Sequence, residues 1–263
     1  MKNAEEKNCK KREQELIANQ AIPKPRAREE IHRVVTLLIE KLNLPLGSKV
    51  LDVPMGPGSL SVFLHRNGYK VYGADIDLNQ SATIDPAIVR KRADLNQSIP
   101  FEDDFFELVV SLEGIEHLEN PFQFIREIAR VLRKGGYFIL STPNICNLEE
   151  RLNFLFRGCF YRFIPPEEFK KNGTGFDHQN LMTWVEMKQI LQWNGLEPLF
   201  LEKDKIKWRQ IFFLWPIALL VWLYGKFQPL SRRKKYCMDD NESFPVIFGG
   251  SSLIIVSRKA TED

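Results

Sequence analysis

The sequence has little of several features that would narrow its function at once. It holds four cysteines in 263 residues, and their spacing is not that of metal ligands (Cys9, Cys146, Cys159 and Cys237). The first residues are polar and charged, so we expect no secretory signal. Both observations predict reduced thiols in a cytosolic protein.

Strong charge and sequence repetition are lacking as well. The formal net charge is +3, which is too small to indicate a nucleic-acid ligand by itself. Internal repeats and low-complexity tracts are absent from the sequence, which excludes repeat architectures. With 44% hydrophobic residues, 15 glycines and 15 prolines, the composition indicates one large α/β domain with an added segment, or one domain and a half.

The sequence does have a regular alternation of apolar strands and amphipathic helices. We expect helices at 27–42, 59–68, 121–136 and 183–194. We expect strands at 49–53, 70–75, 106–111, 137–143, 196–202 and 251–259, with one more short strand that ends near residue 94. Apolar strands separated by helices form a parallel sheet covered on both faces, so the sequence predicts an α/β fold with a doubly wound sheet.

Three parts of the chain differ in composition. Residues 1–26 form a polar N-terminal extension. Residues 27–205 and 245–260 carry the strand and helix pattern and form the expected domain. Residues 206–244 are apolar and basic, and we expect them to form a helical insert before the last strand.

Candidate ligand-binding residues come directly after the first three strands. In an open α/β sheet the ligand lies beyond the carboxyl ends of the strands. Gly56 and Gly58 lack a Cβ, so they let the backbone approach a ligand at the start of a helix. Asp75 can accept from ribose hydroxyls, and Asp94 can accept from the amine of adenine while the amide of Leu95 donates to a ring nitrogen. Each feature alone also fits a tight turn or a surface acid without a ligand.

Five stretches resemble, in order and spacing, the motifs of class I S-adenosylmethionine-dependent methyltransferases: VLDVPMGPG, VYGADID, RADL, FELVVSLEGIEHLENP and EIARVLRKGGYFILSTPN. The resemblance covers about residues 49–144 and lies within the type 11/12 group. It implies S-adenosylmethionine as cofactor and a seven-stranded, mostly parallel, Rossmann-like methyltransferase sheet. By this resemblance Asp52 and the two glycines face the methionine end of the cofactor, Asp75 faces the ribose and Asp94 the adenine. The full predicted cofactor set is Asp52, Gly56, Gly58, Asp75, Ile76, Asp94, Leu95 and Ser111.

Pro54 departs from the resemblance, because the family usually has a glycine at this position. Proline fixes φ near −65° and has no amide hydrogen. If the family glycine only saves space, proline is tolerated; if it needs a positive φ or donates a hydrogen bond, cofactor binding weakens. Pro54 therefore supports an alternative in which the protein is a degenerate, cofactor-binding scaffold without turnover.

Candidate catalytic residues follow the fourth strand, where Glu113, Glu116 and His117 lie within five residues. A histidine beside two carboxylates can act as a general base, or all three can bind a divalent metal. The Glu-x-x-Glu-His pattern is similar to one found in ubiquinone-pathway O-methyltransferases and small-RNA 2′-O-methyltransferases. This resemblance implies a Mg²⁺ or Mn²⁺ site formed by Glu113, Glu116, His117 and His178. The alternative is a metal-free site of the kind found in sugar- and lipid-directed relatives.

The region after residue 143 bears on the methyl acceptor. It resembles methyltransferases found with glycan and cell-surface polysaccharide assembly, so we expect a small-molecule, glycan or lipid-linked acceptor. A metal-dependent RNA 2′-O-methyltransferase is a further alternative, because the region could form a basic groove with stacking aromatic rings. The residues that would form it are Arg151, Arg157, Arg162, Lys170 and Lys171, with Phe156, Phe160 and Tyr161. The sequence favours the first class over nucleic acid.

The insert contains 14 residues without a charge, at 211–224, interrupted by Pro216. This run is short of the roughly 20 apolar residues that span a bilayer. Tryptophans lie within it and basic residues flank it, which is the pattern of a segment in the interface of an anionic membrane. We therefore expect a cytoplasmic protein whose residues 206–235 contact the inner face of the membrane. A helical cover for the sheet or a subunit contact is the alternative, and the oligomeric state is left open.

Overall fold

The computed structural model describes residues 22–160, 165–167 and 178–261. Most of the predicted polar extension lies outside these ranges, as do four members of the predicted basic and aromatic groove: Tyr161, Arg162, Lys170 and Lys171.

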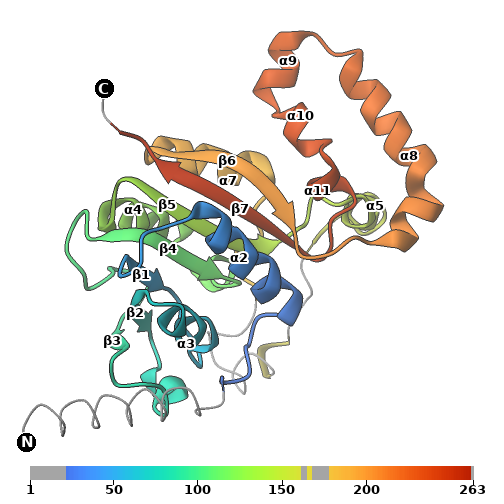
Figure 1. The fold of residues 1–263 in the computed structure, drawn as a ribbon. Coiled ribbons are helices and arrows are strands. Elements are labelled where there is room, and N and C mark those ends of the chain that lie inside the picture. The colour runs from blue at the N-terminus through green and yellow to red at the C-terminus, as the bar shows by residue number, and fades with distance from the viewer. Residues whose placement is uncertain (1–21, 161–164, 168–177, 262–263) are drawn as a thin grey trace, which may run out of the picture.

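A seven-stranded sheet with the order β3-β2-β1-β4-β5-β7-β6 forms the centre of the molecule (Figure 1). All neighbouring strands are parallel except that β7 runs antiparallel to both β5 and β6. The predicted seven-stranded, mostly parallel sheet is therefore confirmed. Its strands are β1 (Lys49–Asp52), β2 (Lys70–Asp75), β3 (Val89–Arg92), β4 (Phe106–Leu112), β5 (Leu132–Pro143), β6 (Leu196–Lys203) and β7 (Ser252–Lys259).

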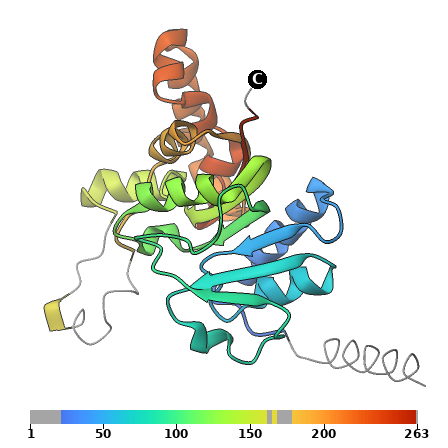
Figure 2. The ribbon, with the colours of Figure 1, turned by 90° about the vertical axis from the view of Figure 1, so that its left-hand side faces the viewer.

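Helices cover both faces of this sheet, as a run of buried parallel strands requires (Figure 2). On one face α2 (Glu29–Leu42) and α3 (Ser59–Arg66) pack with Val50 and Leu108 into one apolar core. On the other face α4 (Pro121–Val131) and α7 (Trp184–Trp193) pack with Phe106 and Phe138 into a second core. The amphipathic pattern of each helix thus decides which side of the helix turns toward the sheet.

The boundary between α4 and β5 differs from the sequence prediction. The predicted helix continues to Gly136, but α4 ends at Val131 and β5 begins at Leu132. Leu132 is fully buried and extended, and it pairs with Phe106 of β4. Burial of Leu132 against β4 outweighs the helical pattern, and Gly135 with φ +72° then redirects the chain into the rest of β5.

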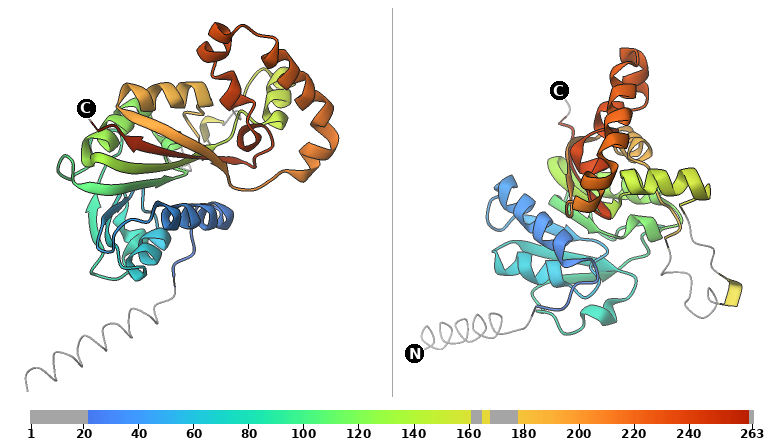
Figure 3. Two further views of the ribbon diagram at one scale, coloured as in Figure 1. Left: turned by 45° about the horizontal axis from the view of Figure 1, so that its top comes forward. Right: turned by 90° about the vertical axis from the view of Figure 1, so that its right-hand side faces the viewer.

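A helical lobe is inserted between β6 and β7 and consists of α8 (Trp208–Lys226), α9 (Leu230–Lys235), α10 (Met238–Asn241) and α11 (Phe244–Ile247). It projects away from the half of the sheet that holds β1 to β3, as Figure 1 and the left view of Figure 3 show. Leu148 of α5 (Leu148–Arg157), Ala218 and Ile247 form its small buried core. By length and composition alone, the 19-residue α8 is able to cross a membrane.

Candidate functional site

The glycine turn after β1 has a backbone that requires glycine at two positions. Gly56 and Gly58 have φ of +52° and +83°, the left-handed region that side chains disfavour. A Cβ on Gly58 would also lie 3.0 Å from Cδ1 of Ile84. Among the described residues, a Cβ on Gly56 would meet only Cδ of Arg26, at 3.9 Å, so these residues leave this side of the turn open to a ligand.

Pro54 is accommodated by Gly114, a glycine that lies far from it in the sequence. A Cβ on Gly114, in the loop after β4, would lie 2.5 Å from Cδ and 2.8 Å from Cγ of Pro54. The proline ring therefore occupies the space beside Gly114. This pairing gives the departure from the family pattern a local structural explanation, and it joins the glycine turn to the loop that carries the candidate catalytic residues.

Asp52, at the end of β1, is a buried carboxylic acid. The hydroxyl of Ser61 on α3 donates to its Oδ2 at 2.6 Å. Burial raises the pKa of Asp52 to about 7, with a further contribution from the nearby Asp75, although the hydrogen bonds from Ser61 act in the opposite direction. Asp52 thus fixes the start of α3 behind the glycine turn.

The end of β2 presents both a carboxylate and an apolar surface. Asp75 accepts hydrogen bonds from the N–H groups of Gly56 at 2.8 Å and Asp77 at 3.0 Å, so its orientation is fixed. Each carboxylate oxygen has a second lone pair that can accept from a ribose hydroxyl. The next residue, Ile76, is a large apolar side chain that is 60% exposed. An exposed apolar side chain beside a fixed carboxylate suits a nucleoside, whose ring needs an apolar surface and whose sugar needs acceptors.

The other predicted cofactor residues have different surroundings. Asp94 accepts from the N–H of Asn96 at 3.0 Å and from Nε2 of Gln97 at 2.9 Å, so it shapes the turn after β3. Leu95 is buried beside it. Ser111 is fully buried in β4, and its Oγ has no hydrogen-bond partner among the described residues. Taken with the open glycine turn and with Asp75 and Ile76, these residues fit S-adenosylmethionine.

Glu116, His117 and His178 come together after β4. One ligand atom from each lies within 4.8 Å of the others, and the two imidazole centroids are 5.0 Å apart. The N–H groups of Gln179 and Asn180 donate to the carbonyl oxygen of Glu116 at 2.7 and 3.0 Å, which holds the His178 segment against the loop. The side chain of Glu116 is fully buried, and neither oxygen has a hydrogen-bond partner in the described part of the chain. Burial, together with the charge of Glu113, raises the pKa of Glu116 well above its usual value.

Glu113 does not lie in this group of three. It has φ +48°, and its carboxylate accepts from the hydroxyls of Ser141 on β5 at 2.9 Å and Ser252 on β7 at 3.1 Å. Burial raises the pKa of Glu113 as well. The structure therefore brings together three of the four predicted metal ligands and directs the fourth toward neighbouring strands.

Asp204 is a buried acid at the same sheet edge that the sequence pattern did not single out. It follows β6, whose carboxyl end lies at the same sheet edge as those of β1, β2 and β4. Its side chain has no exposed surface, and neither oxygen has a hydrogen-bond partner among the described residues. Nη1 of Arg28, just before α2, lies 4.0 Å from Oδ2. The rule that found Asp75 and Asp94, an acid directly after a strand, would also have found Asp204.

Comparison with known proteins identifies the domain that carries the glycine turn. Residues 51–140 match the family model described as a methyltransferase domain. The chain carries a class I S-adenosylmethionine-dependent methyltransferase domain. The matched segment of this methyltransferase domain runs from β1 to β5 and contains every predicted cofactor residue.

Curated relatives of the methyltransferase domain have related descriptions. Methyltransferase GfsG of Streptomyces halstedii is 34% identical over 119 residues, which are 41% of this chain and 42% of that protein. The ubiquinone biosynthesis O-methyltransferase of Pseudomonas syringae pv. tomato is 31% identical over 156 residues, or 51% of this chain and 65% of that protein. The chain thus spans less than two thirds of the length of either relative.

Solved structures share the fold of the methyltransferase domain. A putative methyltransferase from Bacillus halodurans has a TM-score of 0.54 at 20% identity and covers 86% of this chain and 99% of its own. The [4+2]-cyclase SpnF has the same TM-score at 18% identity and covers 88% of this chain and 81% of its own. Because one of these neighbours is described as a cyclase, the fold alone does not decide the reaction.

Proposed function

We propose that the protein transfers the methyl group of S-adenosylmethionine to an oxygen of a glycan- or lipid-linked acceptor at the inner face of the cytoplasmic membrane. The observation that carries the proposal is that the candidate cofactor residues and the candidate catalytic residues share one location. The open glycine turn, the fixed carboxylate of Asp75 and the group of Glu116, His117 and His178 all lie at the carboxyl edge of one sheet. The proline and glycine contact between Pro54 and Gly114 joins the two halves of this edge.

The cofactor residues and the group of Glu116, His117 and His178 have separate tasks in this reaction. The bound cofactor supplies a methyl group on a sulfonium, which is already activated for displacement. The protein has to hold the acceptor oxygen in line, exclude water and remove the hydroxyl proton. We assign proton removal to His117, which lies beside the buried carboxylate of Glu116 and the ring of His178.

Two measurements test this assignment. Calorimetry with S-adenosylhomocysteine reports cofactor binding, and transfer of labelled methyl to membrane-lipid, glycan and RNA fractions reports turnover. The His117→Ala variant should keep cofactor affinity and lose most of its transfer, by roughly 10²–10⁴-fold for loss of a general base. The matched control is His65→Ala, on α3 beside Asp85, which should keep both. Normal transfer by His117→Ala would rule out this base.

The membrane location rests on the outward face of α8. Trp208, Phe212 and Trp215 lie along this face and are 70%, 74% and 57% exposed. A soluble helix normally has a polar outer face, whereas this one fits the apolar part of a membrane interface. The following α9 carries Arg232, Arg233, Lys234 and Lys235, which complement anionic headgroups.

A helix lying in the interface fits this fold better than one that spans the bilayer. If α8 crossed, the chain would have to cross back before β7, which pairs with β5 and β6. The returning helices α9, α10 and α11 have only six, four and four residues, far below the roughly 20 that a crossing needs. We therefore propose peripheral contact through residues 206–235.

Co-sedimentation with vesicles tests this contact. The protein should bind anionic vesicles better than neutral ones, and salt should weaken the difference. Replacing the four basic residues of α9 with glutamine should remove most of the anionic preference. The charge-matched control replaces four exposed basic residues of the domain with glutamine: Arg33 and Lys41 on α2, Lys70 on β2 and Arg92 on β3. This control variant should retain the preference for anionic vesicles. Failure of the wild-type protein to sediment with anionic vesicles at low salt would contradict the proposal.

A bound divalent metal is a second candidate feature of the same site, and the convergence of Glu116, His117 and His178 favours it. The carboxylate suits Mn²⁺ and Mg²⁺, whereas the two imidazoles are a poor match for Mg²⁺, which prefers oxygen ligands, so Mn²⁺ is the better probe of the two. Calorimetry with Mn²⁺ should then show binding that His178→Ala removes. Absence of Mn²⁺ binding together with full transfer in EDTA would exclude the metal and leave His117 as a base.

Two other functions have distinct outcomes in these assays. A scaffold without turnover would bind S-adenosylhomocysteine and transfer methyl to none of the fractions. An RNA methyltransferase would label the RNA fraction. Against RNA, Arg151 of the predicted basic groove is largely buried and donates to the carbonyl oxygens of Cys146 and Asn241, at 2.7 and 2.6 Å. Arg151 thus stabilises the protein rather than offering its charge to a phosphate.

A further inference from the structure

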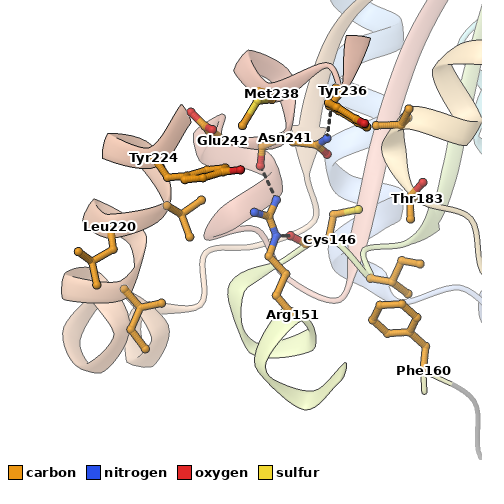
Figure 4. Close-up of a pocket in the computed structure, with 14 residues that line it drawn as sticks. Cys146, Arg151, Phe160, Thr183, Leu220, Tyr224, Tyr236, Met238, Asn241 and Glu242 are labelled. Atoms are coloured by element: carbon orange, nitrogen blue, oxygen red, sulfur yellow. Dashed lines mark hydrogen bonds between the residues drawn. The ribbon is translucent and has the colours of Figure 1, made fainter. Parts of the chain in front are cut away.

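An apolar cavity of about 650 Å³ lies between the helical lobe and the domain (Figure 4). Its volume falls within the range of roughly 300–1,000 Å³ typical of ligand pockets. Ile217, Leu220 and Val221 of α8 form one wall, and Ile145, Phe160 and Val185 contribute from the domain. The cavity is therefore an apolar pocket separate from the predicted cofactor residues at the carboxyl edge of the sheet.

The helix α8 presents apolar side chains to two different sides. Ile217, Val221 and Tyr224 recur at helical spacing and face the cavity, whereas Trp215, Leu219 and Trp222 recur on the outward face and are 45–57% exposed. A helix with both sides apolar suits hydrocarbon on both sides. The outward side faces the proposed membrane. The cavity side is then available for one hydrocarbon chain of a lipid from that membrane.

Charged groups at the cavity do not favour a charged ligand. Arg151 and Glu242 both line it, and they have opposite signs. Arg151 is engaged with the carbonyl oxygens of Cys146 and Asn241, and burial lowers the pKa of its guanidinium. Burial likewise raises the pKa of Glu242. An uncharged hydrocarbon chain therefore suits this space better than a second polar group.

The cavity is close to the proposed catalytic residues along two stretches of chain. Thr183 lines the cavity and lies five residues after His178. Ile145 lines it and lies four residues after Ser141, whose hydroxyl donates to Glu113. At no more than about 3.6 Å per residue, these segments span at most roughly 18 and 14 Å. An amphipathic molecule with a long hydrocarbon chain can therefore reach from the cavity to the proposed catalytic residues.

We propose that this cavity receives the hydrocarbon chain of an amphipathic, lipid-linked acceptor whose polar end lies at His117. The inference rests on the proposed function and gives it a substrate class, an acceptor with a long uncharged tail. The lobe then has two tasks, because its outer face contacts the membrane and its inner face holds the tail during transfer.

Binding of straight-chain alcohols from octanol to dodecanol tests the cavity without requiring turnover. Calorimetry should show affinity rising about fourfold for each added methylene group, the gain expected for apolar burial. Val221→Trp, which fills the cavity, should weaken dodecanol binding at least tenfold. Leu219→Trp makes a comparable side-chain change on the outer face of the same helix and should leave dodecanol binding unchanged.

Three outcomes would overturn the inference. Affinity that does not depend on chain length would do so, as would equal losses in the two tryptophan variants. A protein that sediments as a dimer and becomes monomeric in Val221→Trp would show that a second copy covers the cavity. Calorimetry with S-adenosylhomocysteine on the same samples separates the proposals: normal cofactor binding with no alcohol binding rejects the tail site alone, whereas absent cofactor binding rejects the proposed function.

Discussion

Replacing Asp52 with asparagine should change how stability depends on pH. The folded protein holds the Asp52 proton more tightly than the unfolded chain, because burial raises its pKa from 3.8 to about 7. This group therefore contributes its full stability below about pH 4, and the contribution is lost as the pH rises toward 7. At 1.36 kcal/mol for each pH unit, the roughly three units between the two values correspond to about 4 kcal/mol.

Asparagine keeps an oxygen that can accept from the Ser61 hydroxyl, and it cannot ionise. The free energy of unfolding of Asp52→Asn, relative to wild type, should therefore increase by up to about 4 kcal/mol between pH 4 and pH 7 and stay level above pH 7. Urea unfolding followed by circular dichroism at one-unit pH intervals measures this difference. Glu119→Gln, which removes one exposed carboxylate in the same way, serves as the matched control. Parallel pH profiles for Asp52→Asn and wild type would refute the reasoning that burial dominates at this carboxylate.

Three further substitutions test other parts of the site. Gly114→Ala should cost about 1–3 kcal/mol of stability through its clash with the Pro54 ring, and Pro54→Ala in the same chain should recover most of it in thermal unfolding. Asp75→Ala should weaken S-adenosylhomocysteine binding by about 1.5–3 kcal/mol in calorimetry, and unchanged affinity would remove Asp75 from the cofactor site. Asp204→Asn should stabilise the protein by about 1–3 kcal/mol in urea unfolding, because a buried carboxylate without a hydrogen bond is costly; a stability loss would mean that the contact with Arg28 at 4.0 Å outweighs this cost.

The sequence predicted the sheet because each strand is either an apolar run or is bounded by strong helix and glycine signals. It selected Asp75 and Asp94 as candidate cofactor residues because residues after parallel strands share one edge, and their roles stay a prediction. The end of α4 was misplaced because helical spacing continues into Leu132, whose burial against β4 depends on the assembled sheet.

Contacts between distant residues were beyond the reach of the sequence pattern. Pro54 and Gly114 are separated by 60 positions, and only the parallel pairing of β1 and β4 brings their loops together. The cavity depends in the same way on the packing of α8 against α5, which no local signal specifies. Glu113 directs its carboxylate to Ser141 and Ser252 instead of joining His117 and His178, and its backbone is left-handed, which is unusual for a glutamate and was not expected.

The position of β7 has a consequence for how the protein is made. This strand lies between β5 and β6, yet it is the last of the seven to be synthesised. Until it is inserted, β5 and β6 each present an unpaired edge and the sheet consists of two separate pieces. The apolar α8 leaves the ribosome before β7 does, so a nearby bilayer can capture it while the sheet is still open. Closure of the sheet by β7 would then complete the enzyme at the surface where we propose that it works, and overexpression without membrane lipid should favour aggregation of the incomplete form.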